Sequence, residues 1–294
     1  MKRKRPWLMW IGGAYLVVLV LFSFLVPLMR SGQLMPAEAT NFDAVTAVVD
    51  GPFLEKGGKY PLGTDELGRD VLARLAQGGR TSLLIGLTVQ AIAMCLGLIV
   101  GTIGVYAPKW IREPVMRLTD AMFAFPDILL GMLLIGAFAS ASVANPAVRA
   151  IVEQGTVPVI AALSATAWPS IARLVRSQIA SLKDREYVVA AKASGASTFY
   201  IVTRHVLPQI WGILLAVSMV ELAGTILAES TLSFLGIGIR PPNPSWGGML
   251  NQARQNMQAH PEALIPPAIM LSVSIFALNF VGDGLRAKLD PKNR

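Results

Sequence analysis

The stretch SLKDREYVVAAKASGASTFYIVTRHVLP, residues 181–208, is a polar island between long apolar runs. It has the pattern of two short helices joined by a glycine. Ser181 can cap the first helix, and Gly195 is the residue type that commonly follows a helix end. Ser197 can cap the second helix, and Pro208 then begins a new segment. The pattern predicts a helix pair between two membrane spans, although an ordinary amphipathic loop at this place would look the same.

The composition is that of a protein with several membrane spans. Of the 294 residues, 53% are hydrophobic and 15% are charged, and the mean hydropathy is +0.54; soluble domains carry about 25% charged residues. The net charge of +8 gathers beside apolar runs, which favours membrane orientation over nucleic-acid binding as its cause. Cys95, the single cysteine, excludes an intramolecular disulfide and a thiolate metal cluster.

Six apolar runs are long enough to cross a bilayer as helices. They cover residues 6–29, 83–107, 118–139, 157–174, 208–235 and 262–281. The first run follows four basic residues and is longer than a secretory apolar region, so we expect an uncleaved anchor. Six spans place both termini, the connection at 109–117 and the helix pair on one side. These four places hold most of the basic excess, which predicts that they are cytoplasmic.

The spans divide the chain into three parts. Residues 1–30 form an N-terminal cytoplasmic tail and the first transmembrane helix. Residues 31–80 form an extracytoplasmic loop with an amphipathic helix. Residues 81–294 hold five further transmembrane helices, with the helix pair at about 181–207.

The expected amphipathic helix lies near the end of the extracytoplasmic loop. Leu67, Val71 and Leu75 recur at helical spacing, and Thr64 or Asp65 can cap the helix that carries them. Such an apolar stripe suits a helix at the membrane interface. The adjacent glycines 78 and 79 are expected to end this helix.

Acidic residues inside the apolar runs are candidates for a polar path. A charged side chain at the bilayer centre costs about 2.5–3.5 kcal/mol on insertion scales, so it should face the bundle interior or a cavity. Glu221 and Glu229 lie in the fifth run and Asp127 lies in the third. Each could line a substrate pathway, or could fix helix packing through a hydrogen bond or ion pair.

The sequence holds no catalytic or metal-binding pattern. His205 and His260 are too few and too far apart for a metal pair, and no H-E-x-x-H is present. There is no G-x-x-x-x-G-K-[ST] phosphate loop and no nucleophile–base–acid set. We therefore expect no catalytic residue, metal or cofactor in this chain, and any ATP-driven activity must draw on another chain.

Four segments resemble permease subunits of ABC importers. The spacing of Glu186, Ala190–Ala191, Gly195, Ile201 and Leu207–Pro208 resembles the EAA loop of these permeases. The words PLGTDELGRDVLARLAQGGRTSLLIGL from residue 61, ESTLSFLGIGIRPPNPSWGGML from residue 229 and NFVGDGLRAKLDPKNR from residue 279 resemble the dipeptide and oligopeptide (peptide/nickel) permeases. The resemblance extends from residue 61 to the C-terminal tail; the first 60 residues have no distinctive match.

The resemblance implies an all-α polytopic membrane protein with the type I ABC importer permease fold, five core helices plus an N-terminal helix, in a bacterial or archaeal plasma (inner) membrane. It implies a second homologous permease, two ABC ATPase subunits that bind ATP and Mg²⁺, an extracytoplasmic solute-binding protein and a peptide substrate. The helix pair would be a cytoplasmic coupling element that docks on an ATPase. The docking residues that it implies are Glu186, Tyr187, Ala190, Ala191, Gly195, Ala196, Ile201, His205, Leu207 and Pro208.

Two functional hypotheses follow. In the first, the chain is the permease subunit of an ATP-driven peptide importer, and relatives that carry nickel, glutathione or other solutes leave its substrate open. In the second, the chain is a stand-alone secondary transporter or channel in which Glu221 and Asp127 are coupling acids. Transport by the chain alone would separate the two hypotheses.

Overall fold

The computed structural model describes residues 6–29, 53, 56–57, 60–144, 155–241 and 243–289. The helical elements are α1 (Pro6–Met29), α3 (Val71–Tyr106), α4 (Lys109–Met122), α5 (Asp127–Ala144), α7 (Thr156–Leu182), α8 (Glu186–Ala193), α9 (Thr198–Tyr200), the π-helical turn η2 (Ile201–Val206), α10 (Leu207–Phe234), α11 (Trp246–Gln255), the 3₁₀ turn η3 (Pro261–Leu264) and α12 (Ile265–Leu289). Across these residues the structure is helical, and the only β-type pairings are isolated bridges. The prediction of an all-α polytopic membrane protein is confirmed.

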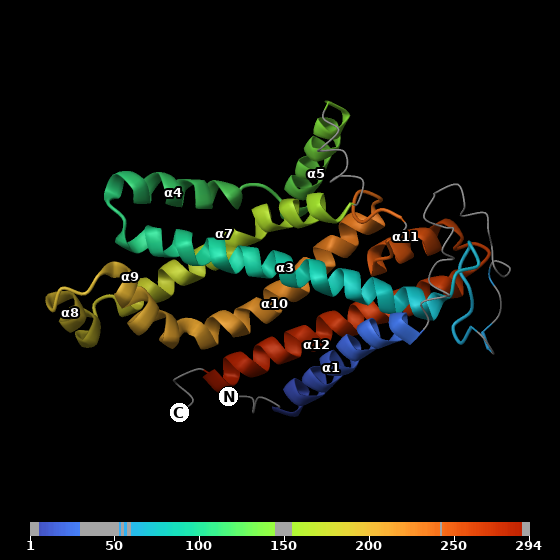
Figure 1. Cartoon of the computed structure of the whole chain (residues 1–294), viewed down its shortest axis with the longest axis horizontal. Coiled ribbons are helices and arrows are strands. Elements are labelled where there is room, and N and C mark those ends of the chain that lie inside the picture. Colours follow the sequence, from blue (N-terminus) through green and yellow to red (C-terminus); the bar gives the residue numbers. More distant parts are fainter. Residues whose placement is uncertain are drawn as a thin grey trace.

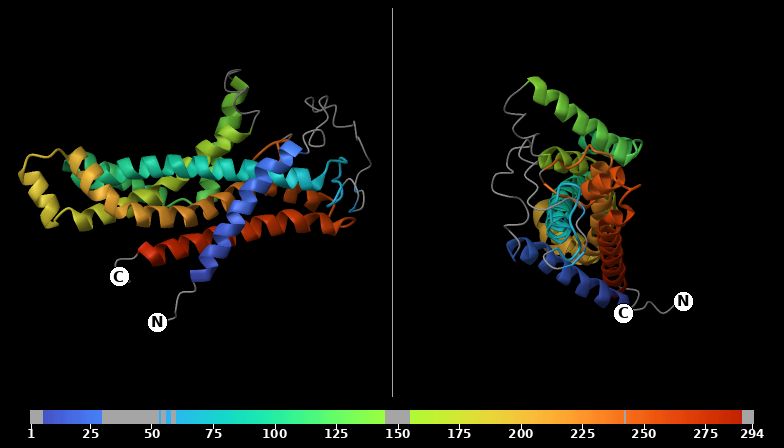
Figure 2. Two further views of the ribbon diagram at one scale, coloured as in Figure 1. Left: turned by 60° about the horizontal axis from the view of Figure 1, so that its bottom comes forward. Right: turned by 90° about the vertical axis from the view of Figure 1, so that its right-hand side faces the viewer.

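The long helices run roughly along one axis of the molecule (Figure 1). Helices α8 and α9 lie at one end and α11 lies at the other, while α5 stands out to the side. The first turn of α1 and the last turn of α12 lie toward the end that carries α8. Figure 2 shows α1 crossing the outside of the bundle, where it contacts α12 and α3. The start of α1, the end of α12 and α8 therefore lie toward the same end of the bundle.

Five helices, counted within the described ranges, are long and apolar enough to span a membrane. They cover Trp7–Met29, Val71–Tyr106, Thr156–Leu182, Thr198–Phe234 and Pro261–Leu289, and a bent pair of helices gives up to six spans. Several of the predicted spans are shorter than the helices that the structure shows. At about 1.5 Å per residue, the 36 residues of α3 extend well beyond a hydrocarbon core of roughly 30 Å.

The third span is the bent pair, and its prediction as one continuous helix over residues 118–139 is wrong. Helices α4 and α5 meet at an angle of 99°. The break covers Phe123–Pro126, where proline lacks an amide donor and disfavours helical geometry in the preceding residue. Arg173 of α7 contacts the chain at this break. Its Nη2 lies 3.0 Å from an Asp120 carboxylate oxygen, and its Cζ lies 3.9 Å from the Phe123 ring centroid.

The predicted amphipathic helix does not exist as a separate element. Helix α3 begins at Val71, and the Asp70 carboxylate caps it by accepting from the Leu72 amide at 2.9 Å. The glycines at 78 and 79 lie inside α3, where a Cβ on Gly79 would come within 2.9 Å of the Trp246 ring. These glycines permit close helix packing instead of ending a helix, and the boundary predicted at residue 80 falls inside α3.

One predicted feature of the helix pair is also wrong. Ser181 lies inside α7 and its hydroxyl donates to the Gln178 carbonyl at 2.8 Å, so it caps nothing. The predicted start of the fifth span at Pro208 agrees with α10, which begins at Leu207, although the helical run continues unbroken from Thr198. Pro208 stands in the first turn of α10, where the missing amide proton is tolerated.

Close contact between α3 and α7 forms the centre of the bundle. A Cβ on Gly97 would clash with the Ile171 side chain, and one on Gly101 would lie 2.7 Å from Val175. Small residues at such positions allow helix backbones to approach closely inside a membrane. The α3–α7 pair thereby gives α10 a fixed surface to pack against, and α12 packs mainly on α10 and α1.

Some predictions concern residues outside the described ranges. These are the basic residues at 2–5, most of the loop at 31–59, the connection at 145–154 and the last residues of the tail, 290–294.

Candidate docking site and polar clusters

The predicted glycine turn joins α8 to α9. Gly195 has a φ of +81°, a left-handed conformation that is costly for residues with a side chain. The Ala196 amide donates to the Ala191 carbonyl at 3.0 Å, as in a Schellman helix ending. Ser197 Oγ accepts from the Tyr200 amide at 3.2 Å and caps the second helix. Gly195 and Ser197 thus have the local roles that their positions predicted.

One side of this segment is anchored in the protein core. Val188 of α8, with Ile201 and Val206 of η2, is buried. They share an apolar cluster with Ile171, Val175 and Ile179 of α7 and with Ile210 and Leu214 of α10. Full burial of an aliphatic side chain contributes roughly 1.5–3 kcal/mol, so the segment is firmly attached to two membrane helices.

The opposite side exposes aromatic and small residues. Phe199 is 79% exposed, Tyr200 50% and Tyr187 37%, and Val189 and Ala190 of α8 are exposed beside them. Aromatic residues are enriched at protein–protein contacts, and exposed apolar patches commonly mark such surfaces. We call residues 186–208 the docking segment.

A cluster of rings connects the parts of the docking segment. The His205 ring lies edge-on to Tyr200 with centroids 5.6 Å apart, and tilted to Tyr187 with centroids 6.3 Å apart. Such aromatic pairs contribute about 0.5–1.5 kcal/mol beyond the burial of their surface. Because Tyr187 belongs to α8 and His205 to η2, the cluster holds the two elements in one orientation.

The residues predicted to dock differ in accessibility. Glu186, Tyr187, Ala190, Gly195 and Pro208 are exposed, whereas Ala191, Ala196, Ile201, His205 and Leu207 are partly or fully buried. Ile201 is only 3% exposed, which limits it to supporting the segment. The sequence prediction omitted Phe199. This residue is the second after the cap Ser197, so little of its own helix can cover its aromatic side chain.

The two acids proposed for coupling lie on helices that contact each other. Glu221 is half-buried on α10, and Asp127 is the exposed first residue of α5.

The third acid, Glu229, is separated from this pair and fully buried. Its carboxylate accepts from Ser82 Oγ of α3 at 2.8 Å, from Ser233 Oγ at 2.8 Å and from Ser230 Oγ at 3.4 Å. The contacts match the alternative in which the acid fixes helix packing.

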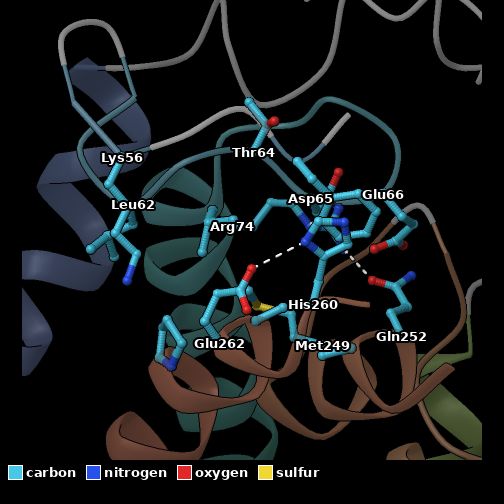
Figure 3. Close-up of a pocket in the computed structure, with 15 residues that line it drawn as sticks. Lys56, Leu62, Thr64, Asp65, Glu66, Arg74, Met249, Gln252, His260 and Glu262 are labelled. Atoms are coloured by element: carbon cyan, nitrogen blue, oxygen red, sulfur yellow. Dashed lines mark hydrogen bonds and ion pairs between the residues drawn. The ribbon is translucent and has the colours of Figure 1, made fainter. Parts of the chain in front are cut away.

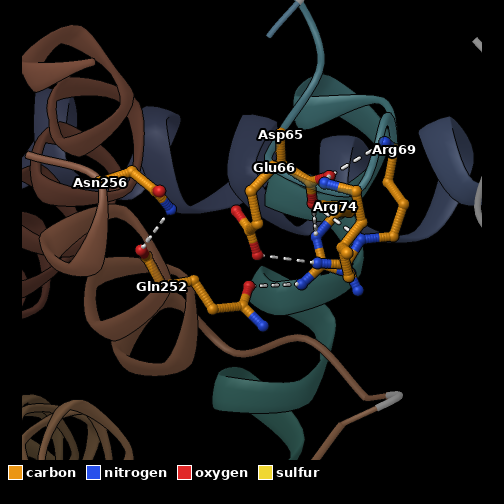
Figure 4. Close-up of polar contacts among 7 residues, drawn as sticks. Asp65, Glu66, Arg69, Arg74, Gln252 and Asn256 are labelled. Atoms are coloured by element: carbon orange, nitrogen blue, oxygen red, sulfur yellow. Dashed lines mark hydrogen bonds and ion pairs between the residues drawn. The ribbon is translucent and has the colours of Figure 1, made fainter. Parts of the chain in front are cut away.

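A polar cluster at the α11 end of the molecule was not predicted. Asp65 accepts from the amides of Leu67 and Arg69 at 3.0 and 2.9 Å, and its second oxygen lies 2.8 Å from Arg69 Nε. Arg74 of α3 donates to Gln252 Oε1 of α11 at 3.0 Å (Figure 4). Its Nε lies 3.1 Å from the Asp65 carboxylate, although not in hydrogen-bonding geometry. The cluster ties the start of α3 to α11.

A pocket of about 520 Å³ opens beside this cluster (Figure 3). Its polar lining includes Asp65, Arg74 and Glu262, and its apolar lining includes Leu62 and Met249. The stacked rings of Phe53 and His260, 3.9 Å apart, form part of its wall. Within the described part of the chain, no group of three or more His, Cys, Asp or Glu side chains could hold a metal ion.

Comparisons with known proteins agree with this architecture. The family described as "Binding-protein-dependent transport system inner membrane component" matches residues 93–294. The chain is 34% identical over 281 residues to the glutathione transport system permease protein GsiD of Pectobacterium atrosepticum, covering 96% of this chain and 86% of that protein. It is 37% identical over 257 residues to the oligopeptide transport system permease protein OppC of Haemophilus influenzae, covering 87% and 76%.

A solved structure supports the fold. A chain of the MetNI methionine ABC transporter, in an inward-facing conformation, superposes with a TM-score of 0.59 at 19% identity. The match covers 74% of this chain and 96% of that chain. At this identity the likeness concerns the fold.

Proposed function

The chain belongs to the family of inner-membrane components of binding-protein-dependent transport systems, and on that premise we propose that it forms half of the pathway for di- or oligopeptides in an ATP-driven importer. It is a multi-pass permease subunit of an ABC importer, and ATP hydrolysis belongs to a separate subunit. The docking segment carries the proposal, because it is anchored in α7 and α10 while presenting an exposed aromatic surface.

We place the docking segment, the α1 start and the α12 end in the cytoplasm, and α11 outside. Basic residues in the α12 end, such as Arg286 and Lys288, favour this orientation. Two ATPase subunits, which bind ATP and Mg²⁺, would dock at the cytoplasmic end. A second homologous permease would complete the pathway, and a solute-binding protein would approach the end with α11. The three-part division at residues 30 and 80 remains our proposal for the chain's organisation, with the α3 start shared between parts.

The residues of the docking segment have two proposed roles. The ATPase is contacted by the exposed residues Glu186, Tyr187, Ala190, Phe199 and Pro208. That surface is supported from below by the less exposed residues Ala191, Ala196, Ile201 and Leu207. Gly195 sets the turn and His205 fixes the angle between α8 and η2. Glu221 and Asp127 line the substrate pathway, where carboxylates can attract a peptide's ammonium group.

Glutathione is the alternative substrate that the comparisons favour, since GsiD proteins are named for its transport. Glutathione is itself a modified peptide, so both substrates share amide and carboxylate groups. Nickel or another small solute is a further alternative. Competition by each solute for uptake of a labelled peptide would rank them.

Reconstitution into proteoliposomes tests the proposed function. The chain alone should transport no peptide, with or without an ion gradient. The chain purified with its associated permease, ATPases and binding protein should take up peptide only when ATP is supplied. Gradient-driven uptake by the chain alone would support a stand-alone transporter and overturn the proposal.

A further inference from the structure

The buried carboxylate of Glu229 joins α10 to α3, which is distant in the sequence. It accepts from Ser82 Oγ of α3 and from Ser230 Oγ and Ser233 Oγ of its own helix. Ser245 Oγ, just before α11, accepts from the Gly248 amide at 3.2 Å and so caps α11. We call Glu229, Ser82, Ser230 and Ser233 the serine cage. All of its donors to the carboxylate are neutral hydroxyls, so its strength depends on their positions.

The chain beyond α10 is fixed against the serine cage by further contacts. We call residues 236–241 and 243–255 the outer segment. The Ile239 amide donates to Ser233 Oγ at 3.0 Å, and Trp246 Nε1 donates to the Leu75 carbonyl at 3.0 Å. A Cβ on Gly247 would come within 2.5 Å of the Ser230 backbone, so the two backbones are in direct contact. The outer segment thus packs on α10 and α3 as one body.

Helix α10 connects this body to the docking segment. The helical run from Thr198 to Phe234 has 37 residues, which corresponds to about 55 Å at 1.5 Å per residue. Its first turns hold Ile201 and Val206 in the apolar cluster under the docking segment. Its last turns hold Glu229 and Ser233 in the serine cage. The two ends of one helix therefore carry the two surfaces that face partner proteins.

We propose that Glu229 is a positioning residue, and that the serine cage makes the outer segment move together with α10 when the docking segment is displaced. The inference rests on the proposed function. Nucleotide-driven motion at the ATPase would then reach the opposite face of the membrane through a rigid connection. Glu229 would not contact the substrate: it is fully buried and lies eight residues, or roughly 12 Å of helix, beyond Glu221.

The chemistry of the cage suggests a set of matched variants. Glutamine at 229 keeps an acceptor oxygen, and its amide can donate to a serine hydroxyl that rotates to accept. Leucine at 229 removes every hydrogen bond that the serine hydroxyls donate to this side chain. Ser82→Ala with Ser233→Ala removes two donors and retains the carboxylate. Thr88→Ala with Thr231→Ala is the matched control, because these hydroxyls donate only to carbonyls of their own helices.

The test uses the complex of this chain with the ATPases that co-purify with it, in a Cys95→Ala background. Gln255→Cys, at the exposed end of α11, reports on the outer segment. Its reaction rate with a membrane-impermeant maleimide is measured without nucleotide and with ATP plus vanadate. Peptide uptake and ATP hydrolysis are measured on the same preparations. Ser82→Ala alone is included as the mildest cage variant, so that an assembled complex is available if the others do not assemble.

The parent, Glu229→Gln and the threonine control should all show a nucleotide-dependent change in rate. The assembled cage variants should lose that change and lose uptake, while still hydrolysing ATP. Retention of the change in the cage variants would overturn the proposal. Loss of uptake in Glu229→Gln with the rate change intact would also overturn it, because the carboxylate would then act on substrate. No rate change in the parent would overturn this inference alone, since ATPase co-purification and ATP-dependent uptake test the proposed function separately.

Discussion

Residue 195 adopts a left-handed backbone conformation, with φ at +81°. The residue types that fit there are therefore set by their backbone preferences. A Cβ on Gly195 would meet no atom within 4 Å, so the cost of a substitution is conformational and not steric. For Gly195→Val we expect the native turn to cost about 1–2 kcal/mol more. This corresponds to roughly a tenfold decrease in the amount of ATPase that co-purifies. Gly195→Asn should retain more, because asparagine tolerates this conformation.

Gly13→Ala is the control for this experiment. Gly13 also has open space around its Cβ position, but it lies in α1 with ordinary helical geometry. Its ATPase content should equal that of the parent. Equal ATPase content in Gly195→Val and the parent would contradict the assigned role of the turn.

Arg74 is the residue whose loss should most weaken the end of the molecule that carries α11. Its side chain is 5% exposed and bridges Asp65 and Gln252. Removing one partner of a buried ion pair costs about 3–5 kcal/mol; Arg69 still compensates Asp65, so Arg74→Ala should fall near the lower value. We expect a clear drop in the temperature of unfolding in detergent, measured by circular dichroism.

Lys109→Ala provides the comparison for Arg74→Ala. Lys109 lies 3.6 Å from Glu113 with its side chain 78% exposed, and such surface pairs contribute little. Its unfolding temperature should stay near that of the parent. Equal drops in both variants would show that the Arg74 contacts contribute no more than a surface pair.

Among the helices, the α3–α7 contact depends on glycine at 97. A methyl group there would clash with the Ile171 side chain and lie 3.0 Å from the Ala172 backbone nitrogen. Gly97→Ala should therefore separate the helices and destabilise the bundle by about 1–3 kcal/mol, the usual cost of overpacking. Gly136→Ala, where nothing lies within 4 Å, should unfold at the parent's temperature in the same assay. Indistinguishable unfolding temperatures for the two variants would contradict the close packing of α3 on α7.

Local chemistry in the sequence predicted some elements well. The turn at Gly195 and the cap at Ser197 depend on residues within a few positions, and the structure shows both. The glycines at 78 and 79 misled the prediction because their reason lies in Trp246, which only the fold brings beside them. Local sequence patterns cannot indicate a contact with a residue so distant in the sequence.

The same limit applies to the polar clusters. Ser82 and Glu229 are 147 residues apart, and Arg74 and Gln252 are 178 apart. Glu229 could be recognised as a membrane-embedded acid, but its partner Ser82 comes from α3, which only the fold brings beside it. The bend between α4 and α5 was missed because internal prolines are tolerated in membrane helices, so Pro126 did not by itself indicate a break.

At the scale of the whole molecule, the orientation in the membrane determines which partner each end can reach. Our assignment puts Ser194, at the end of α8, in the cytoplasm and Gln255, at the end of α11, outside. In a Cys95→Ala background, Gln255→Cys should react with an impermeant maleimide in intact cells. Ser194→Cys should react only after the membrane is permeabilised. The reverse pattern would show that the orientation is inverted.

The central claim is that the docking segment binds an ATPase subunit, and photo-cross-linking tests it most directly. Phe199, the most exposed aromatic residue of the segment, is replaced by p-benzoylphenylalanine; the same analogue at Phe276 of α12, which is 59% exposed, serves as the control. Irradiation of the intact complex should link position 199 to an ATP-binding subunit, identified by mass spectrometry, and position 276 should give no such product. An intact complex in which position 199 forms no adduct with an ATPase would contradict the account.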